Sequence, residues 1–155
     1  MRILNLVLLL EELEAAFYAD AEARGALRGE LAEFARVVGE HEQAHVAFLR
    51  KALGGQAEPK PSFDFGNTTA DRERFAATAA LLEDTAVAAY NGQAVNLTKP
   101  VLRAAATIVS VEARHAAWIR DIVGQPASPQ ATDTPATERK VRRTLARTGF
   151  VKGGG

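Results

Sequence analysis

The sequence predicts an all-α protein: a four-helix bundle with one long crossover between its second and third helices, plus a short C-terminal helix. Three observations predict this fold. Apolar residues recur at helical spacing in four long segments, glycine and proline separate those segments, and the second half of the bundle repeats the first. We place the bundle at residues 3–124, followed by a linker, a short basic helix and a flexible tail over residues 125–155.

The composition is that of one globular domain. The chain has 155 residues, 47% of them apolar and 25% charged, with a formal net charge of zero. Such a balance gives no strong field that points to nucleic acid or an anionic membrane. We expect no nucleic-acid partner and no membrane span. The chain has no Cys, which excludes disulfides, thiolate metal sites and cysteine nucleophiles.

The first helix is expected over residues 3–23, where leucines recur at helical spacing, and Arg24-Gly25 ends it. Its opening run, residues 3–10, is apolar except for Asn5. The run is too short to span a bilayer and no small-residue cleavage site follows, so a buried helix start is favoured over a signal peptide. The second helix is expected from Ala26 or Glu30 to Leu53, with Gly54-Gly55 as its end.

A long connection, residues 54–69, joins the two halves of the chain. About fifteen residues at ~3.3 Å each reach ~50 Å, longer than a 24-residue helix of ~36 Å. The connection can therefore cross the bundle and set the second and third helices parallel. Phe63 and Phe65 are expected to hold it against the bundle surface.

The third helix is expected from Thr68-Thr69, as N-cap residues, to Asn91. Thr98 and Pro100 then suit the start of a fourth helix that ends at Gly124. Residues 125–137 read as a solvated linker, and Thr137 as the cap of a short basic helix reaching Arg147. The basic run 138–143 is expected to be a solvated face and not a nucleic-acid site, because no aromatic residues interleave with it. Residues 153–155 are expected to be disordered.

The most informative feature is a repeated motif. The segment E-Q-A-H-V-A-F-L-R-K-A-L-G (42–54) returns as E-A-R-H-A-A-W-I-R-D-I-V-G (112–124). A single Glu-x-x-His is weak, because an i, i+3 pair is also a common surface ion pair. Here two of the three His in the chain stand in it, each heading the same thirteen-residue pattern. Glu42 with His45, and Glu112 with His115, are therefore expected to point into the bundle as metal ligands.

The partner helices supply matching carboxylates. Glu11 precedes Tyr18 by seven residues, and Glu83 precedes Tyr90 by the same interval, so the repeat covers whole helix hairpins. Four Glu and two His without thiolate suit iron or manganese better than structural zinc. The expected cofactor is a pair of iron ions, or manganese, or one of each. The six expected ligands are Glu11, Glu42, His45, Glu83, Glu112 and His115.

This arrangement, one Glu from each of two helices and Glu-x-x-His from each of the other two, resembles the ferritin-like di-iron carboxylate superfamily. The segments L-E-E-L-E-A-A-F-Y, F-D-F-G-N, L-E-D-T-A-V-A-A-Y and A-T-D-T-P are more specifically similar to the ferritin-like domain of bacterial and desiccation-related proteins. The resemblance implies that Glu42 and Glu112 bridge two metal ions. It also implies terminal carboxylates in Glu11 and Glu83, and terminal imidazoles in His45 and His115.

Several neighbours have competing interpretations. Glu12 and Glu14 are rivals of Glu11, and Glu14 suits either a ligand or a group behind the ligands. The tyrosines are expected to be core aromatics with satisfied hydroxyls, in preference to radical carriers. Asp84 is expected to be an exposed or outer charge, and His41 to face solvent.

The repeat pairs further residues. Phe48 and Trp118 are expected in the core, and Arg50 and Arg120 are expected to pair with acidic neighbours. Gly39 is expected to permit either a close helix approach or a local bulge.

Three functions fit these residues. One is a redox protein that brings Fe(II), O₂ or peroxide to a dinuclear metal centre, such as a ferroxidase. The second is a non-enzymatic stress or desiccation-related structural protein, and the third, ranked last, is a subunit of an iron-storage cage. The oligomeric state stays open, a homo-oligomer included. Location stays open between the cytoplasm and export by a segment preceding Met1.

Overall fold

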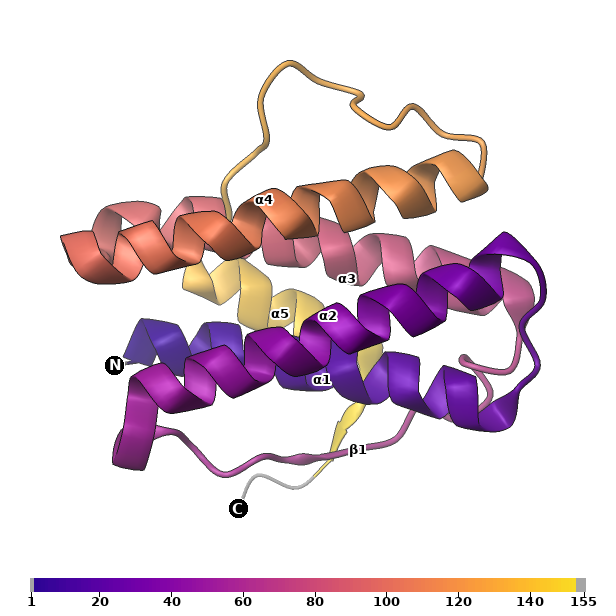
Figure 1. Ribbon diagram of the computed structural model, residues 1–155, viewed down its shortest axis with the longest axis horizontal. Helices are drawn as coiled ribbons and strands as arrows, with labels where there is room; N and C mark the ends of the chain where they lie inside the picture. The colour runs from indigo at the N-terminus through magenta and orange to yellow at the C-terminus, as the bar shows by residue number, and fades with distance from the viewer. Residues whose placement is uncertain (1, 153–155) are drawn as a thin grey trace.

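The structure, a computed structural model, describes residues 2–152 and consists of four long helices and a shorter fifth. The long helices are α1 (Arg2–Arg24), α2 (Glu30–Leu53), α3 (Arg72–Gln93) and α4 (Lys99–Ile122). Figure 1 shows them side by side along the long axis of the molecule, with α2 and α3 running in the same direction. The predicted all-α bundle with a short C-terminal helix is confirmed. The predicted disorder of residues 153–155 lies outside the described residues.

The crossover between α2 and α3 travels the length of the bundle (Figure 1). It begins with a 3₁₀ turn, Gly54–Gln56, and includes the short strand β1, Ser62–Phe63. Buried Asn5 holds the start of the crossover, because its side chain donates to the Gln56 carbonyl (2.9 Å) and accepts from the Glu58 amide (2.9 Å). These bonds explain the one polar residue in the apolar opening of α1. Phe65 packs edge-on against Phe17 within the core, and Phe63 packs against the same cluster, so both rings hold the crossover to the bundle as predicted, with Phe65 buried more deeply than a surface contact.

Helix α3 begins later than predicted. Asp71 is its N-cap and accepts a hydrogen bond from the Arg74 amide, whereas Thr68 and Thr69 lie in the preceding turn. The threonine pair was misleading because Thr69 is fully buried and its hydroxyl donates to Asp20 of α1 instead of capping a helix. The helix also runs to Gln93, past the predicted stop at Asn91.

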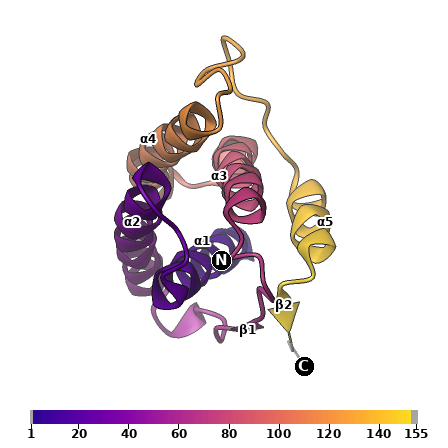
Figure 2. The same ribbon diagram turned by 90° about the vertical axis from the view of Figure 1, so that its right-hand side faces the viewer.

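The C-terminal segment folds back onto the bundle. Helix α5 (Glu138–Thr148) lies beside α3, on the side away from α4 (Figure 2), and Thr137 caps it as predicted. Strand β2 (Val151–Lys152) pairs antiparallel with β1. The prediction of a solvated helix is wrong for one face, because Val141 and Leu145 are buried in the main core.

The segment before α5 is also anchored. The Ala136 amide donates to the Ala88 carbonyl of α3 (2.8 Å), although most of the linker is exposed. A Cβ on Gly92 would lie 1.9 Å from the Ala136 carbonyl oxygen, so only glycine permits this close approach.

The long helices bury their apolar faces against one another in two clusters. The larger centres on Phe17, Phe34 and Phe75, and the smaller on Leu8, Leu49 and Ile108. No helix among residues 2–152 is long and apolar enough to cross a membrane. Phe48, predicted in the core, is 43% exposed. That prediction is wrong, because the Phe48 ring lines a cavity that opens to solvent.

Candidate metal centre

The six side chains predicted as metal ligands meet in the middle of the bundle. One comes from α1, one from α3 and two each from α2 and α4, and the four carboxylates are fully buried. Their oxygen and nitrogen atoms form two groups of four, and within each group these atoms lie within 4.8 Å of one another. The first group is Glu11, Glu42, His45 and Glu112, and the second is Glu42, Glu83, Glu112 and His115.

Glu42 and Glu112 belong to both groups because their two oxygens point to different imidazoles. Glu42 places Oε2 at 3.2 Å from His45 Nδ1 and Oε1 at 3.1 Å from His115 Nδ1. Glu112 places Oε1 at 2.9 Å from His45 Nδ1 and Oε2 at 3.9 Å from His115 Nδ1. Each outer carboxylate serves one group, with Glu11 at 3.2 Å from His45 and Glu83 at 3.3 Å from His115.

Helix geometry explains this convergence. Residues i and i+3 share a helix face, so each Glu-x-x-His presents both side chains to one place. Gly39, one turn before Glu42, lets α2 approach α1 closely, since a Cβ there would lie 3.1 Å from the Tyr18 Cβ. This supports the close-approach interpretation of Gly39.

The two tyrosines cross-link the hairpins. Tyr18 of α1 donates its hydroxyl to Glu83 of α3, and Tyr90 of α3 donates to Glu11 of α1 (2.5 Å). Both rings are buried, so they are core aromatics with satisfied hydroxyls, as predicted. Their acceptors are the two outer carboxylates, which the tyrosines therefore hold in place.

Comparison with known protein families agrees with this geometry. Residues 1–125 match the ferritin-like domain. The chain belongs to the ferritin-like family. No curated protein matches it significantly. The ferritin-like match covers all four long helices, and therefore every residue of the two groups described above.

Two ion pairs flank the candidate metal centre. Arg50 binds Glu12, and Arg120 binds Asp84, at equivalent positions of the two hairpins. The prediction that these arginines pair with acidic neighbours is confirmed. Glu12, a rival of Glu11, points at Arg50 and lies outside both groups.

Two further residues beside the site break the repeat: Glu14, for which the sequence left open a ligand or a group behind the ligands, and His41, which was expected to face solvent. Glu14 has Ala86 as its counterpart in the other hairpin, and it is fully buried with no hydrogen bond to either oxygen among the described residues. His41 has Val111 as its counterpart. Its ring stacks on His115, with Nδ1 at 2.9 Å from His115 Nε2.

The sequence carried a signal for both. Glu14 lies three residues after Glu11 and His41 four residues before His45, which places each on the same helix face as a predicted ligand. The prediction that His41 faces solvent is only half right: the residue is exposed, but one ring nitrogen faces the site.

Protons balance the buried charge when no metal is bound. Burial opposes ionisation, yet close contacts with the surrounding carboxylates raise the pKa of both His45 and His115 to about 12. Burial raises the pKa of Glu83 to about 8, and burial with neighbouring carboxylates raises the pKa of Glu11 and Glu14 well above their usual range. Glu42 behaves differently: burial opposes its ionisation, but its bonds to the imidazoles lower its pKa to about 2.

Proposed function

We propose that this ferritin-like protein binds two metal ions, iron, manganese or one of each, through Glu11, Glu42, His45, Glu83, Glu112 and His115. The observation that carries the proposal is the division of the Glu42 and Glu112 oxygens between two imidazoles. A carboxylate placed in this way suits a bridge between two cations, whereas the outer carboxylates and imidazoles suit one cation each.

Several of the proposed ligand atoms have no hydrogen-bond partner within residues 2–152, and a bound metal ion would supply one contact for each. Among the described residues, Glu42 Oε1, Glu83 Oε2, both Glu112 oxygens and His115 Nδ1 are buried without a well-formed hydrogen bond. Unpaired buried polar groups are costly, and a cation placed among these converging atoms would satisfy them. A set of oxygen and nitrogen ligands without sulfur suits iron or manganese better than structural zinc.

The charges also balance. Two divalent cations carry four positive charges, matching the four carboxylates of the six-residue set. Glu14 would then remain protonated, because burial and its acidic neighbours raise its pKa. Both imidazoles, Glu83 and Glu11 carry protons that stabilise the metal-free site. Metal binding would displace these protons.

A redox role follows from this donor set. Bound iron or manganese would supply one-electron chemistry at each ion towards O₂ or peroxide. Tyr18 and Tyr90 orient the outer carboxylates, and His41 orients the His115 ring by binding its Nε2. Fe(II) itself, as in a ferroxidase, and peroxide are the two substrates we propose.

A non-enzymatic stress or structural role is the second candidate, and the closure of the site favours it. The four carboxylates are fully buried, and the most exposed side chain of the six, His45, is only 12% accessible. Metal bound in so closed a site would chiefly stabilise the bundle, because a ligand that binds only the folded state raises its stability.

Metal analysis of matched variants tests the proposal. Protein reconstituted anaerobically with Fe(II) is expected to hold two ions per chain by mass spectrometry of the metal. Glu42→Gln should lose at least one ion, whereas Glu40→Gln, two residues away, should keep both because Glu40 is exposed and pairs with Arg36. Circular dichroism confirms folding of each variant, and Glu112→Gln repeats the test from α4.

Admitting O₂ to the loaded protein separates the two roles. Rapid oxidation of bound Fe(II), followed by further turnover with added Fe(II) or peroxide, supports the redox role. Two tightly bound ions without turnover, together with a higher unfolding temperature, support the structural role. Less than one ion per chain in the wild type contradicts the proposed metal site and leaves a structural role that does not depend on metal.

A further inference from the structure

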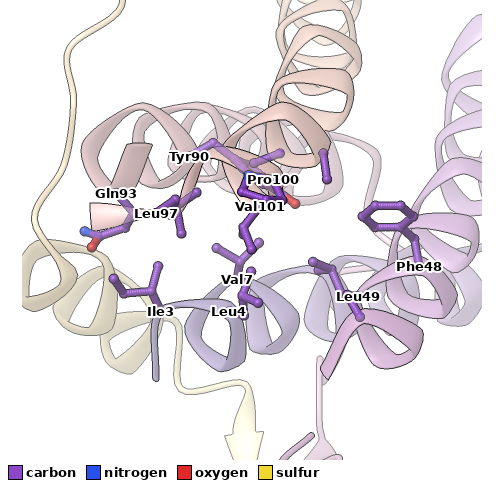
Figure 3. Close-up of a pocket in the computed structure, with 13 residues that line it drawn as sticks. Ile3, Leu4, Val7, Phe48, Leu49, Tyr90, Gln93, Leu97, Pro100 and Val101 are labelled. Carbon is purple, nitrogen blue, oxygen red and sulfur yellow. The ribbon is translucent and has the colours of Figure 1, made fainter. Parts of the chain in front are cut away.

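A second feature of the bundle is an apolar cavity one helical turn from the candidate metal centre. It lies where the start of α1, the end of α2, the end of α3 and the start of α4 come together. Figure 3 shows Leu4 and Val7 of α1 facing Pro100 and Val101 of α4 across it. The cavity holds about 250 Å³. An engineered apolar cavity of ~150 Å³ in another protein is known to bind benzene.

One part of the cavity lining is buried, although the cavity opens to solvent. Leu4, Val7, Leu49 and Tyr90 all line it, yet each is less than 9% exposed. Phe48 also lines it and is 43% exposed, so its ring borders the open side. A deep apolar hollow of this kind loses packing contacts as long as only water occupies it. An apolar occupant of matching size would restore them.

The described lining of the cavity offers no free polar group that could bind a charged ligand. Only Tyr90 and Gln93 carry polar side-chain atoms among the described lining residues, and no lining residue is charged. The Tyr90 hydroxyl already donates to Glu11. The Gln93 amide nitrogen donates to the Ala136 carbonyl (3.5 Å), and its oxygen accepts from Asn96 (3.2 Å). A charged group placed here would be desolvated without a partner.

We propose that this cavity binds an uncharged, apolar organic molecule of roughly ten carbon atoms, the size obtained by scaling benzene from ~150 Å³. The occupant lies against the Tyr90 ring, whose hydroxyl holds the outer carboxylate Glu11. Val7 lies one turn before Glu11, and Leu49 one turn after His45. The site therefore places an apolar molecule beside the metal centre, while binding itself requires no metal.

A small molecule fits this cavity better than a second copy of the chain. A flat protein surface packed over Phe48 would cover the opening without reaching Val7 or Tyr90, which are buried at 3% and 4% exposure. The volume to be filled lies behind the rim, and a compact hydrocarbon can enter it.

The test is calorimetric titration of the full chain with n-butylbenzene, which has ten carbons. Saturable 1:1 binding is expected in both chelator-treated and metal-loaded protein, so the outcome does not depend on the proposed metal function. The charged analogue 4-phenylbutylamine should bind at least tenfold more weakly. Ala105→Leu narrows the cavity and should weaken n-butylbenzene binding at least tenfold, whereas Ala106→Leu, exposed and outside the lining, should leave it unchanged.

Circular dichroism must show both variants folded, and Ala104→Leu offers a second narrowing change in the lining. Absence of saturable binding overturns the proposal, and so does equal binding of the charged analogue. Equal affinity in the wild type and in both narrowed variants also overturns it, because binding would then lie elsewhere. A dimer seen by light scattering that does not bind n-butylbenzene assigns the surface to a second copy and likewise refutes the proposal.

Discussion

Raising the pH from 5 to 7 is expected to destabilise the metal-free protein, because folding forces Glu83 to keep a proton that the unfolded chain releases. Burial raises the pKa of Glu83 from 4.5 to about 8. Below pH 4.5 the group is protonated in both states and contributes nothing. Above it, the folded state binds more protons than the unfolded state, so the free energy of unfolding falls as pH rises.

The size of the effect follows from the shift. Each pH unit inside the window costs about 1.4 kcal/mol for one proton, so Glu83 alone removes about 3 kcal/mol between pH 5 and 7. Glu11 and Glu14 act in the same direction, because their pKa values are also raised. Glu42 does not oppose them here: its pKa is lowered to about 2, so its contribution is complete above pH 4.5 and is lost only in more acidic solution.

Urea unfolding of chelator-treated protein at pH 5, 6 and 7 measures this slope. Glu83→Gln should reduce the slope by about 1.4 kcal/mol per pH unit, and Glu40→Gln, at an exposed position, should leave it unchanged. Metal-loaded protein should show a level or rising stability, because bound cations replace the protons. A metal-free protein whose stability is level or increases from pH 5 to 7 would show that folding does not hold a proton on Glu83.

Four further outcomes follow from the same geometry. Metal binding at pH 7 should release about three or more protons per pair of ions, because the pKa values of His45, His115 and Glu83 are raised. Calorimetry in buffers of different ionisation enthalpy counts the released protons. Metal binding without proton release would contradict the proposed site. His41→Ala should weaken binding of one ion by about 10–100-fold, with Gln43→Ala as the unaffected control. Tyr18→Phe and Tyr90→Phe should each lower the free energy of unfolding by about 1–3 kcal/mol in urea titrations, and negligible effects would exclude the cross-links. Gly92→Ala should destabilise the protein by more than about 1 kcal/mol and speed proteolysis within residues 125–137, unlike Gly55→Ala, whose Cβ would meet no described atom within 4 Å.

The four helices and their pairing were predictable because they leave local signals. Helical periodicity, glycine stops and a long connection are all properties of neighbouring residues, and the internal repeat showed that the two hairpins are equivalent. The same repeat singled out six side chains, and the structure brings all six together.

The errors arose where distant contacts decide the outcome. Thr69 looked like a helix cap, but Asp20 of another helix binds its hydroxyl. Phe48 was predicted in the core because it matches Trp118 in the repeat. Trp118 packs against the core, but the cavity beside α4 leaves the Phe48 ring exposed. Helix α5 looked solvated from its charges, although two apolar residues, Val141 and Leu145, were enough to anchor it.

An anomalous-scattering map of crystals grown with Fe(II) or Mn(II) tests the central claim most directly. Two peaks are expected between Glu42 and Glu112, separated by about 3.5–4 Å, one beside His45 and one beside His115. A map with no peak there, or with metal only at the protein surface, would contradict that claim.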